Sequence, residues 1–319
     1  MTGMNKESRI YVAGHRGLVG SAIVRSLKND GYENIITRTH AELDLENYQS
    51  VNDFFKQEKP EYVFLAAAKV GGILANYNYP ADFILKNLMI QNHVIHNCYM
   101  HAVKRMIFLG SSCIYPRLCQ QPMKEEYLMT GSLESTNSPY AVAKIAGIEM
   151  CWAYNRQYGT QFIPVMPTNL YGPYDNFDLE TSHVLPALIR KMHEANENQK
   201  DTVTLWGTGL AKREFLYVED MAEACIFIMK ESDKISKDNK TPLFNIGTGE
   251  DLTIKKLAEV IKNIVDFKGE IVWDTTKPDG TPQKLLDVSK IEALGWRAGI
   301  GLESGIRKTY EWFVENTCK

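Results

Sequence analysis

Apolar residues in the first half of the chain occur as short continuous runs, separated by longer stretches with helical periodicity. The runs are RIYVAG (9–14), NIITR (34–38), YVFLAAA (62–68), RMIFLG (105–110) and IPVMPTN (163–169). Between the first two, LVGSAIVRSLKNDG predicts an amphipathic helix that ends at Gly31. Continuous apolar strands that alternate with amphipathic helices indicate a parallel sheet covered on both faces. We therefore predict an α/β fold with a doubly wound, Rossmann-type sheet.

After Tyr171 the alternation becomes less regular. HVLPALIRKMHEA (183–195) predicts a helix, FNIGTG (244–249) predicts a strand followed by a glycine turn, and the polar segments 195–201 and 231–240 predict exposed connectors. We predict a Rossmann domain over residues 1–172 and a smaller C-terminal domain over residues 173–319. Segments near 213–248 are candidates to return to the first sheet.

Composition narrows the class of protein. Hydrophobic residues make up 44% of the chain, charged residues 24%, and the formal net charge is -3, so we expect a globular protein without a nucleic-acid partner. The N-terminus MTGMNKESRI lacks the apolar run of a signal peptide, and no apolar stretch is long enough to span a bilayer. The six cysteines are scattered without a CxxC pair, which predicts free thiols in a cytoplasmic protein and no metal site.

A glycine-rich turn follows the first predicted strand, in the sequence Gly14-His15-Arg16-Gly17-Leu18-Val19-Gly20. Glycine lets a dinucleotide pyrophosphate approach the backbone, and the following helix offers free N–H groups and the positive end of its dipole. The pattern is GxxGxxG and not the standard GxGxxG. An ordinary strand-to-helix turn is the alternative, but the position directly after the first strand favours a cofactor site.

The end of the second strand bears on the choice of cofactor. NAD sites place an acidic residue there for the ribose 2′-hydroxyl, whereas this chain has Thr37-Arg38-Thr39-His40 and no acid before Glu42. Arg16 and Arg38, together with His40, are suited to hold a 2′-phosphate. The alternative is that these are solvated surface cations. We predict NADP (NADPH) as the cofactor and assign residues 1–172 to its binding.

Three residues form a candidate catalytic group. Ser138-Pro139 predicts a helix start, and Tyr140 and Lys144 follow at a spacing that places both on one helical face. We expect the ammonium of Lys144 to lower the pKa of the Tyr140 phenol. Ser111 follows the fourth strand, at the sheet edge where active sites of open α/β folds lie. The alternatives are one more amphipathic helix and a serine that caps a turn.

The glycine turn, Ser111, Tyr140 and Lys144 together resemble the extended short-chain dehydrogenase/reductase family. The segments AAAKVGGI, GSSCIYP, SPYAVAKIAG, MPTNLYGPYDNF, SHVLPAL and KPDGTPQKLLD resemble one branch of it, the GDP-L-fucose synthases. These enzymes are GDP-4-keto-6-deoxy-D-mannose 3,5-epimerase/4-reductases. The resemblance runs from about Arg9 to the C-terminus, and it implies this activity, a GDP-sugar substrate and the oxidation of NADPH.

The resemblance also implies a role for each matching position. The reductase residues are Ser111, Tyr140 and Lys144, and the epimerisation residues are Cys113 and His183. The cofactor-binding positions are Gly14, His15, Arg16, Gly17, Leu18, Val19, Gly20, Arg38, His40, Asp44, Leu45, Leu109, Gly110, Lys144, Pro167, Thr168, Asn169, Leu170 and His183. The substrate-binding positions are Asn169, Lys191, Trp206, Arg213, Asp279 and Lys284. Lys191 and His40 depart from relatives that carry arginine there, and lysine gives up a bidentate grip on phosphate.

The chemistry of Cys113 and His183 agrees with an epimerase. A 4-keto group acidifies the protons on C3 and C5, and inversion needs one group to remove a proton and another to deliver one to the opposite face. Thiols and imidazoles both exchange protons near neutral pH. The alternatives are a small buried thiol, a histidine at a helix start, and a shared zinc site, for which the chain has no clustered ligand spacing.

The C-terminal half carries residues suited to the nucleotide. Trp206-Gly207-Thr208-Gly209 precedes Arg213-Glu214-Phe215, so an aromatic ring can pack near the base or sugar and Arg213 can pair with a diphosphate. Core packing for Trp206 and a surface salt bridge for Arg213 are the alternatives. We assign residues 173–319 mainly to nucleotide-sugar binding.

Two other functions remain open. One is an NAD-retaining nucleotide-sugar 4-epimerase or 4,6-dehydratase; a dehydratase is expected to carry an acidic pair where this chain has Ser112-Cys113-Ile114. The other is a non-catalytic NADP-sensing protein, which would not need a proton donor. The apolar helical segments 81–101 and 140–158 predict, by the resemblance, a homodimer through a four-helix contact.

Overall fold

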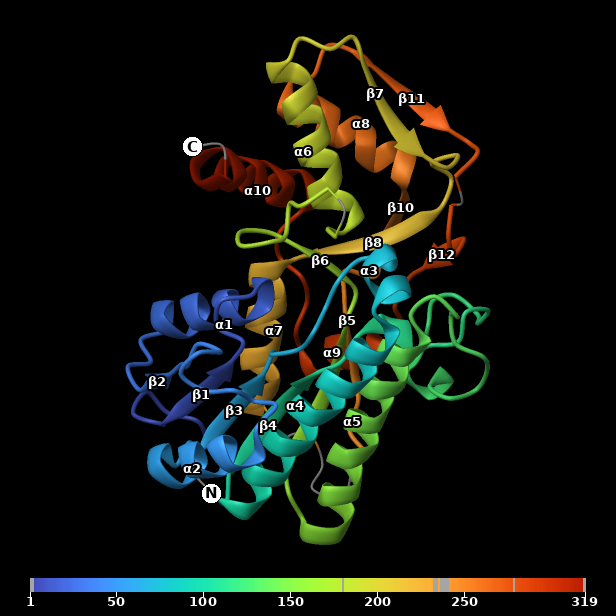
Figure 1. Cartoon of the computed structure of the whole chain (residues 1–319). Helices are drawn as coiled ribbons and strands as arrows, with labels where there is room; N and C mark the ends of the chain where they lie inside the picture. Colours follow the sequence, from blue (N-terminus) through green and yellow to red (C-terminus); the bar gives the residue numbers. More distant parts are fainter. Residues whose placement is uncertain (1–2, 180, 232–234, 236–240, 278, 318–319) are drawn as a thin grey trace.

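Six parallel strands form the central sheet of the protein (Figure 1), seen in a computed structural model that describes residues 3–179, 181–231, 235, 241–277 and 279–317. The strand order is β2-β1-β3-β4-β5-β9, and every neighbouring pair is parallel. The strands are β1 (Ile10–Ala13), β2 (Ile35–Ile36), β3 (Tyr62–Leu65), β4 (Arg105–Leu109), β5 (Phe162–Pro167) and β9 (Phe244–Ile246). Nearly all their residues are buried, as continuous apolar strands require. The predicted α/β class with a Rossmann-type parallel sheet is confirmed.

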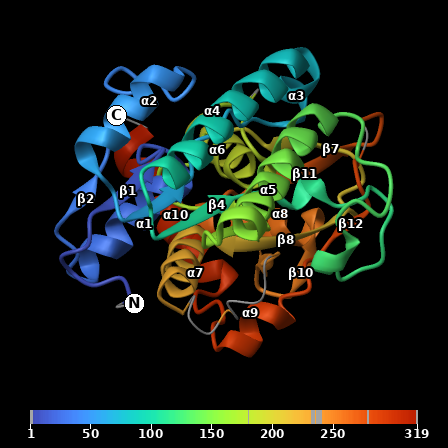
Figure 2. The same ribbon diagram turned by 90° about the horizontal axis from the view of Figure 1, so that it is seen from below.

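Helices cover both faces of this sheet (Figure 2). On one face α1 (Leu18–Asn29) packs against α7 (Val218–Glu231). On the other face α4 (Pro80–Met100) packs along α5 (Ser138–Tyr158), with α2 (Tyr48–Glu58) beside α4. α5 begins at Ser138-Pro139, as the sequence predicts, because proline at the first turn needs no N–H partner.

A second group of elements lies beyond the carboxyl ends of the strands, at the top of Figure 1. β8 (Lys212–Tyr217) pairs with β6 (Asn169–Tyr171), β10 (Asp251–Thr253) and β12 (Gln283–Lys284), while β7 (Thr202–Trp206) pairs with β11 (Glu270–Asp274). Their apolar core, with α6 (Val184–Glu197), α8 (Ile254–Val265) and α10 (Leu302–Thr317), forms a separate hydrophobic cluster. The short elements are α3 (Ile73–Asn78), α9 (Ser289–Leu294) and the 3-10 turns η1 (Ser112–Ile114) and η2 (Glu125–Tyr127).

The chain crosses between these two groups more than once. β9 lies beside β5 at the edge of the first sheet, and α7 packs against α1, although both follow β8 in the sequence. The 213–248 region therefore contributes to both groups of elements. The functional division near residue 172 remains a prediction.

Several local expectations can be compared with the structure. The predicted second strand, 34–38, is reduced to two residues because β2 lies at the sheet edge and pairs on one side only. α1 ends at Asn29, and Gly31 follows with a φ of 78°, a left-handed conformation that favours glycine. Most of the predicted connector 231–240 and Cys318 lie outside the described residues. Within the described part of the chain, no helix is both long and apolar enough to span a bilayer.

Candidate active site

The glycine turn after β1 shows why each of its glycines is present. Gly14 has a φ of 85°, and a Cβ on it would lie 2.7 Å from the amide nitrogen of Ala67. A Cβ on Gly20 would lie 2.1 Å from the carbonyl oxygen of Gly14, so α1 can pack on the turn only with glycine there. Gly17 is different, since its Cβ would meet only an ordinary contact at 3.5 Å. Packing does not require glycine at Gly17, which is compatible with the predicted close approach of a ligand to the start of α1.

Residues predicted to bind the cofactor follow the carboxyl ends of four parallel strands. Because these strands run in the same direction, their carboxyl ends lie at one edge of the sheet. Gly14 to Gly20 follow β1, and Arg38, His40, Asp44 and Leu45 follow β2. Gly110 follows Leu109 at the end of β4, and Thr168 to Leu170 follow Pro167 at the end of β5. The structure brings these segments to one edge, and their contact with a cofactor remains a prediction.

The candidate 2′-phosphate residues differ in their surroundings. Arg38 is half-buried; it forms an ion pair with Glu58 and lies over the ring of Phe54 at 5.6 Å from its centroid. The side chain of Arg16 is exposed. His40 is also exposed, with its Nδ1 at 3.8 Å from a carboxylate oxygen of Asp44. The side chains of Arg16 and His40 are therefore open to solvent, whereas that of Arg38 is held in place.

Ser111, Cys113 and Tyr140 lie close together at the carboxyl end of β4. Ser111 follows β4, and its hydroxyl accepts a hydrogen bond from the Cys113 amide at 3.4 Å. The Ser111 side chain also lies close enough to the side chains of Cys113 and Tyr140 to lower the pKa of each. The ring of Tyr140 packs edge-on against Phe83, with centroids 6.2 Å apart. One predicted reductase residue, Tyr140, and one predicted epimerase residue, Cys113, thus lie beside the same serine.

The electrostatics of this group correct one expectation. We expected Lys144 to lower the pKa of Tyr140, but burial raises the pKa of the Tyr140 phenol well above its usual value. Burial also lowers the pKa of Lys144 to about 8, since the ammonium is only 4% exposed. Desolvation therefore outweighs charge attraction here. The phenol is held in its protonated form, which suits a proton donor.

Lys284 is the second cation near Cys113. Cys113 is buried, and burial raises the pKa of its thiol, while the nearby charges of Lys284 and Lys144 lower it. Cys113 and Lys284 line one small cavity together with Glu134. Glu134 also forms an ion pair with Arg117 at 3.2 Å. The predicted substrate residue Lys284 therefore lies within reach of the same site as Cys113.

His183 immediately precedes α6 and caps it with extended backbone. His183 as a whole residue is exposed, yet desolvation by the protein around its ring lowers the pKa of the imidazole. Gly72 donates a hydrogen bond to the carbonyl of Thr181 at 3.0 Å, which holds this segment against the loop after β3. A Cβ on Gly72 would lie 3.1 Å from carbonyl oxygens of Thr181 and Ser182, so this close approach favours glycine.

The candidate nucleotide end is built around an exposed tryptophan. Trp206 ends β7 with 65% of its surface exposed, and the ammonium groups of Lys191 and Lys277 lie 6.0 and 5.5 Å from its ring. Asp279 accepts hydrogen bonds from the amide and hydroxyl of Thr208, each at 2.7 Å, and so orders the turn after Trp206. The alternative of core packing for Trp206 is wrong, since the ring faces solvent.

Some residues of the site had no local signal in the sequence. Asn87 in α4 accepts from the amide of Lys69 and donates to its carbonyl, both at 3.0 Å, and so fixes the loop after β3. Phe83 supports the ring of Tyr140. In the Gly172–Phe177 turn, burial raises the pKa of Asp175 to about 7. The sequence motif AAAKVGGI predicts the loop after β3, but it gives no sign that Asn87, 18 residues further along the chain, holds this loop.

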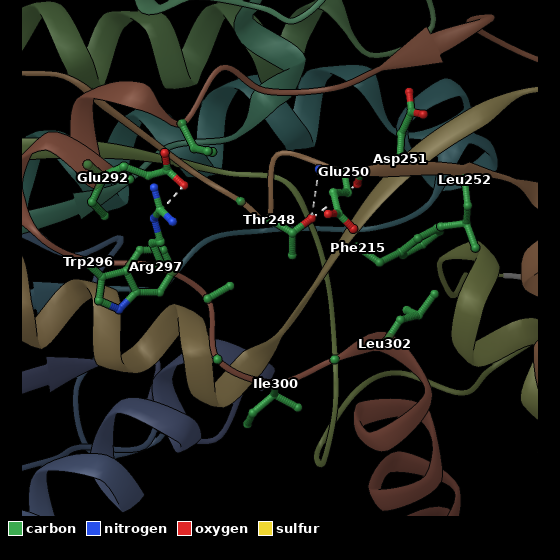
Figure 3. A pocket seen from close by; sticks show the side chains of 16 residues that line it. Phe215, Thr248, Glu250, Asp251, Leu252, Glu292, Trp296, Arg297, Ile300 and Leu302 are labelled. Carbon is green, nitrogen blue, oxygen red and sulfur yellow. Dashed lines mark hydrogen bonds and ion pairs between the residues drawn. The ribbon is translucent and has the colours of Figure 1, made fainter.

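A larger recess lies away from these residues (Figure 3). Its walls carry Phe215, Thr248 and Leu252 on one side and Trp296 and Ile300 on the other, and the close-up shows the ion pair between Arg297 and Glu292. None of the predicted catalytic residues lines it. Of the predicted catalytic residues, Cys113 alone lines the smaller cavity, so we place the chemistry around Ser111, beside that cavity and away from the larger recess.

Comparison with known proteins identifies the family. Residues 10–247 match the NAD dependent epimerase/dehydratase family. The chain belongs to this family. A protein of Arabidopsis thaliana named putative GDP-L-fucose synthase 2 is 56% identical over 98% of this chain and 94% of its own length. The GDP-L-fucose synthase of Escherichia coli (strain K12) is 52% identical over 98% of both chains.

Solved structures agree with this assignment. A GDP-6-OMe-4-keto-L-xylo-heptose reductase of Campylobacter jejuni has a TM-score of 0.93 and 43% identity over 99% of this chain and all of its own. A GDP-mannoheptose C4 reductase of the same organism, solved with NADP bound, has a TM-score of 0.89 and 45% identity over 98% and 99% of the two chains. The resemblance seen in the sequence motifs is therefore confirmed, and a nicotinamide dinucleotide is the type of cofactor used in this family.

Proposed function

We propose that this protein converts GDP-4-keto-6-deoxy-D-mannose to GDP-L-fucose, by inverting C3 and C5 and then reducing C4 with NADPH. The observation that carries the proposal is the position of Ser111, whose hydroxyl accepts a hydrogen bond from the Cys113 amide and whose side chain lowers the pKa of both Cys113 and Tyr140. One site thereby holds a group that exchanges protons and a group that donates a proton to oxygen. The names of the relatives at 52–56% identity support the same substrate.

The residues at the sheet edge fit NADPH. The open position at Gly17 and the start of α1 would hold the pyrophosphate, and Arg16 with Arg38 would hold the 2′-phosphate. Bound NADPH supplies the hydride that reduces C4. The NADP found in a structural relative supports this choice over NAD.

Epimerisation needs proton transfer at two carbon atoms beside the ketone. We assign it to Cys113 and His183, because a thiol and an imidazole both exchange protons near neutral pH. Lys284 and Lys144 favour the thiolate of Cys113 against the effect of burial. The hydroxyl groups of Ser111 and Tyr140 stabilise the enolate oxygen that forms at C4.

Reduction needs a proton on the C4 oxygen as the hydride arrives. Tyr140 donates this proton, since burial keeps its phenol protonated. Ser111 hydrogen-bonds the same oxygen and orients it. Lys144 is fixed at the end of β4 and places a positive charge beside the site.

An assay with the proposed substrate and NADPH tests this proposal directly. GDP-4-keto-6-deoxy-D-mannose is supplied with NADPH, loss of nicotinamide absorbance is followed, and NMR identifies the product. We expect one NADPH oxidised per sugar and inversion at C3 and C5. Turnover without net NADPH oxidation would indicate an NAD-retaining epimerase or dehydratase instead. Reduction without inversion would indicate a C4 reductase, the activity named for two structural relatives.

We further propose that the protein is a homodimer in the cytoplasm. The helices α4 and α5 pack along each other and expose Leu85, Met100, Val142 and Tyr158. Such an apolar face fits a second copy through a two-fold contact. Among the described residues all five cysteines are free thiols, which supports a reducing compartment.

A further inference from the structure

Glu214 is a fully buried carboxylate that the proposed chemistry does not use. It lies in β8, with 0% of its surface exposed. Its Oε1 accepts hydrogen bonds from the amides of Thr248 at 2.6 Å and Gly249 at 2.9 Å. Its Oε2 accepts one from the amide of Leu286 at 2.9 Å. One side chain thus joins β8 to the turn after β9 and to the segment that follows β12.

The surroundings of this carboxylate are closely fitted to it. A Cβ on Gly247 would lie 2.1 Å from Glu214 Oε1, so no larger residue fits at that position without moving the carboxylate. Burial raises the pKa of Glu214, and the hydrogen bonds from backbone amides oppose that shift. A buried acid is costly unless donors surround it, which argues that the arrangement has a purpose.

The neighbours of Glu214 in the sheet are the proposed GDP-sugar residues. Arg213 of β8 is the register partner of Lys284 of β12, so both side chains lie on one face of this sheet. Arg213 is also near enough to Lys284 to lower its pKa. Successive residues of a strand point to opposite faces, so Glu214 lies behind this pair of cations.

The main chain of Glu214 also contacts the cofactor side of the site. Its carbonyl oxygen accepts hydrogen bonds from the Nδ2 of Asn169 at 2.8 Å and the Oγ1 of Thr168 at 3.2 Å. Both residues are cofactor-binding positions implied by the resemblance, and Asn169 is also a predicted substrate-binding position. β8 is therefore held to the turn after β9 and to the segment after β12 through the Glu214 carboxylate, and to the predicted cofactor-binding segment through the Glu214 carbonyl.

We infer that Glu214 is a positioning residue for the GDP-sugar, which holds Arg213 and Lys284 side by side so that both grip the diphosphate and sugar. The positive charges of Arg213 on β8 and Lys284 on β12 repel each other. The hydrogen bond from the Leu286 amide to the buried Glu214 carboxylate keeps the two strands together against this repulsion. This inference rests on the proposed function, because it takes Arg213 and Lys284 as the substrate cations.

Glu214→Gln tests the inference with almost no change in size. The amide replaces one acceptor oxygen by a donor, which then faces a backbone N–H and leaves it unpaired. We expect the KM for the GDP-keto-sugar to rise by ~10-fold or more, while kcat changes less and the Kd for NADPH stays within about twofold. Glu250→Gln is the matched control, since Glu250 is exposed in the same turn, and it should leave KM unchanged.

A double variant separates positioning from general support of the fold. If Glu214 acts by holding Arg213 and Lys284 together, then Arg213→Ala with Glu214→Gln should raise KM by less than the product of the two single effects. If the Gln variant fails to fold, Glu214→Asp keeps the charge but withdraws it by about one bond, and KM should rise in the same direction.

Three results would overturn the inference. The first is a folded Gln or Asp variant with the KM of the wild type, and the second is additivity in the double variant. The third is an unchanged KM for Arg213→Ala, which would remove the proposed substrate site and the inference with it. The first two leave the proposed function standing, so the two failures can be told apart.

Discussion

The ammonium of Lys144 donates a hydrogen bond to the carbonyl oxygen of Leu109 at 2.8 Å, which ties α5 to the last residue of β4. The same ammonium lies 5.8 Å from the centre of the Tyr140 ring. Ser111 follows Leu109 by two residues, so this single bond fixes the distance between the two elements that carry the proposed proton donor and its hydroxyl partner. The charge state of Lys144 should therefore affect the rate of C4 reduction.

The rate of reduction should depend on pH through Lys144. Burial lowers its pKa to about 8, so the ammonium is present below that pH and is lost as pH rises through it. We expect kcat to fall over this range, and Lys144→Met to be slow with a flat profile above neutral pH. A kcat–pH profile of the wild type that stays constant between about pH 7 and 9.5 would contradict this.

The stability of the fold should depend on pH in the opposite direction from kcat. Between about pH 8 and the ordinary lysine pKa of ~10.4, the unfolded chain binds the proton that the folded protein lacks. The contribution of Lys144 to the free energy of unfolding therefore increases with pH in this window. Comparing urea unfolding of the wild type and Lys144→Met at both ends of the window measures it, with Lys28→Met as an exposed control.

Epimerisation and reduction should separate in variants. Tyr140→Phe removes the proton donor and should lower turnover at least ~10²-fold. Cys113→Ser and His183→Asn should slow exchange of the C3 and C5 hydrogens with deuterated solvent while hydride transfer persists. Those two variants should then release C4-reduced products with uninverted centres.

NMR of the product formed in heavy water checks this partition. Cys119→Ser is the matched control for the thiol, because Cys119 lies in the neighbouring loop and is only partly buried. If Cys113→Ser and His183→Asn both take up deuterium at C3 and C5 like the wild type, these residues are structural.

NADPH should be used with a higher kcat/KM than NADH. Arg38 carries the charge expected to bind the 2′-phosphate, and its pairing with Glu58 holds it in place. Arg38→Ala should narrow the gap between the cofactors by lowering efficiency with NADPH more than with NADH. Equal efficiency of the wild-type enzyme with both cofactors would exclude this role.

A charge placed on the α4–α5 face should dissociate the dimer. Leu85 is 58% exposed and Val142 is 45% exposed, so aspartate at either position does not disturb the monomer core. Light scattering at micromolar concentration should report a dimer for the wild type and a monomer for Leu85→Asp with Val142→Asp. A monomeric wild type would refute the homodimer, and Leu179→Asp serves as an exposed control elsewhere.

Sequence patterns were sufficient for features that are built locally. The glycine turn, the strand before Ser111 and the helix that presents Tyr140 and Lys144 each lie within one continuous segment, and the structure places them as expected. The family could also be predicted from short motifs, because each motif lies within one continuous segment and forms a single turn or strand end.

Features made by distant segments were not visible in the sequence. Glu214 meets Thr248 and Leu286, which follow it by 34 and 72 residues. Asn87 acts on a loop 18 residues before it. The direction of the Tyr140 pKa was wrong because desolvation depends on what packs around the phenol, and helical spacing to Lys144 does not reveal that.

The return of β9 and α7 to the first sheet has a consequence for truncated forms of the protein. A chain cut after residue 172 would leave the edge of β5 unpaired and strip α1 of the helix that packs against it. The amino-terminal part is thus not an autonomous folding unit.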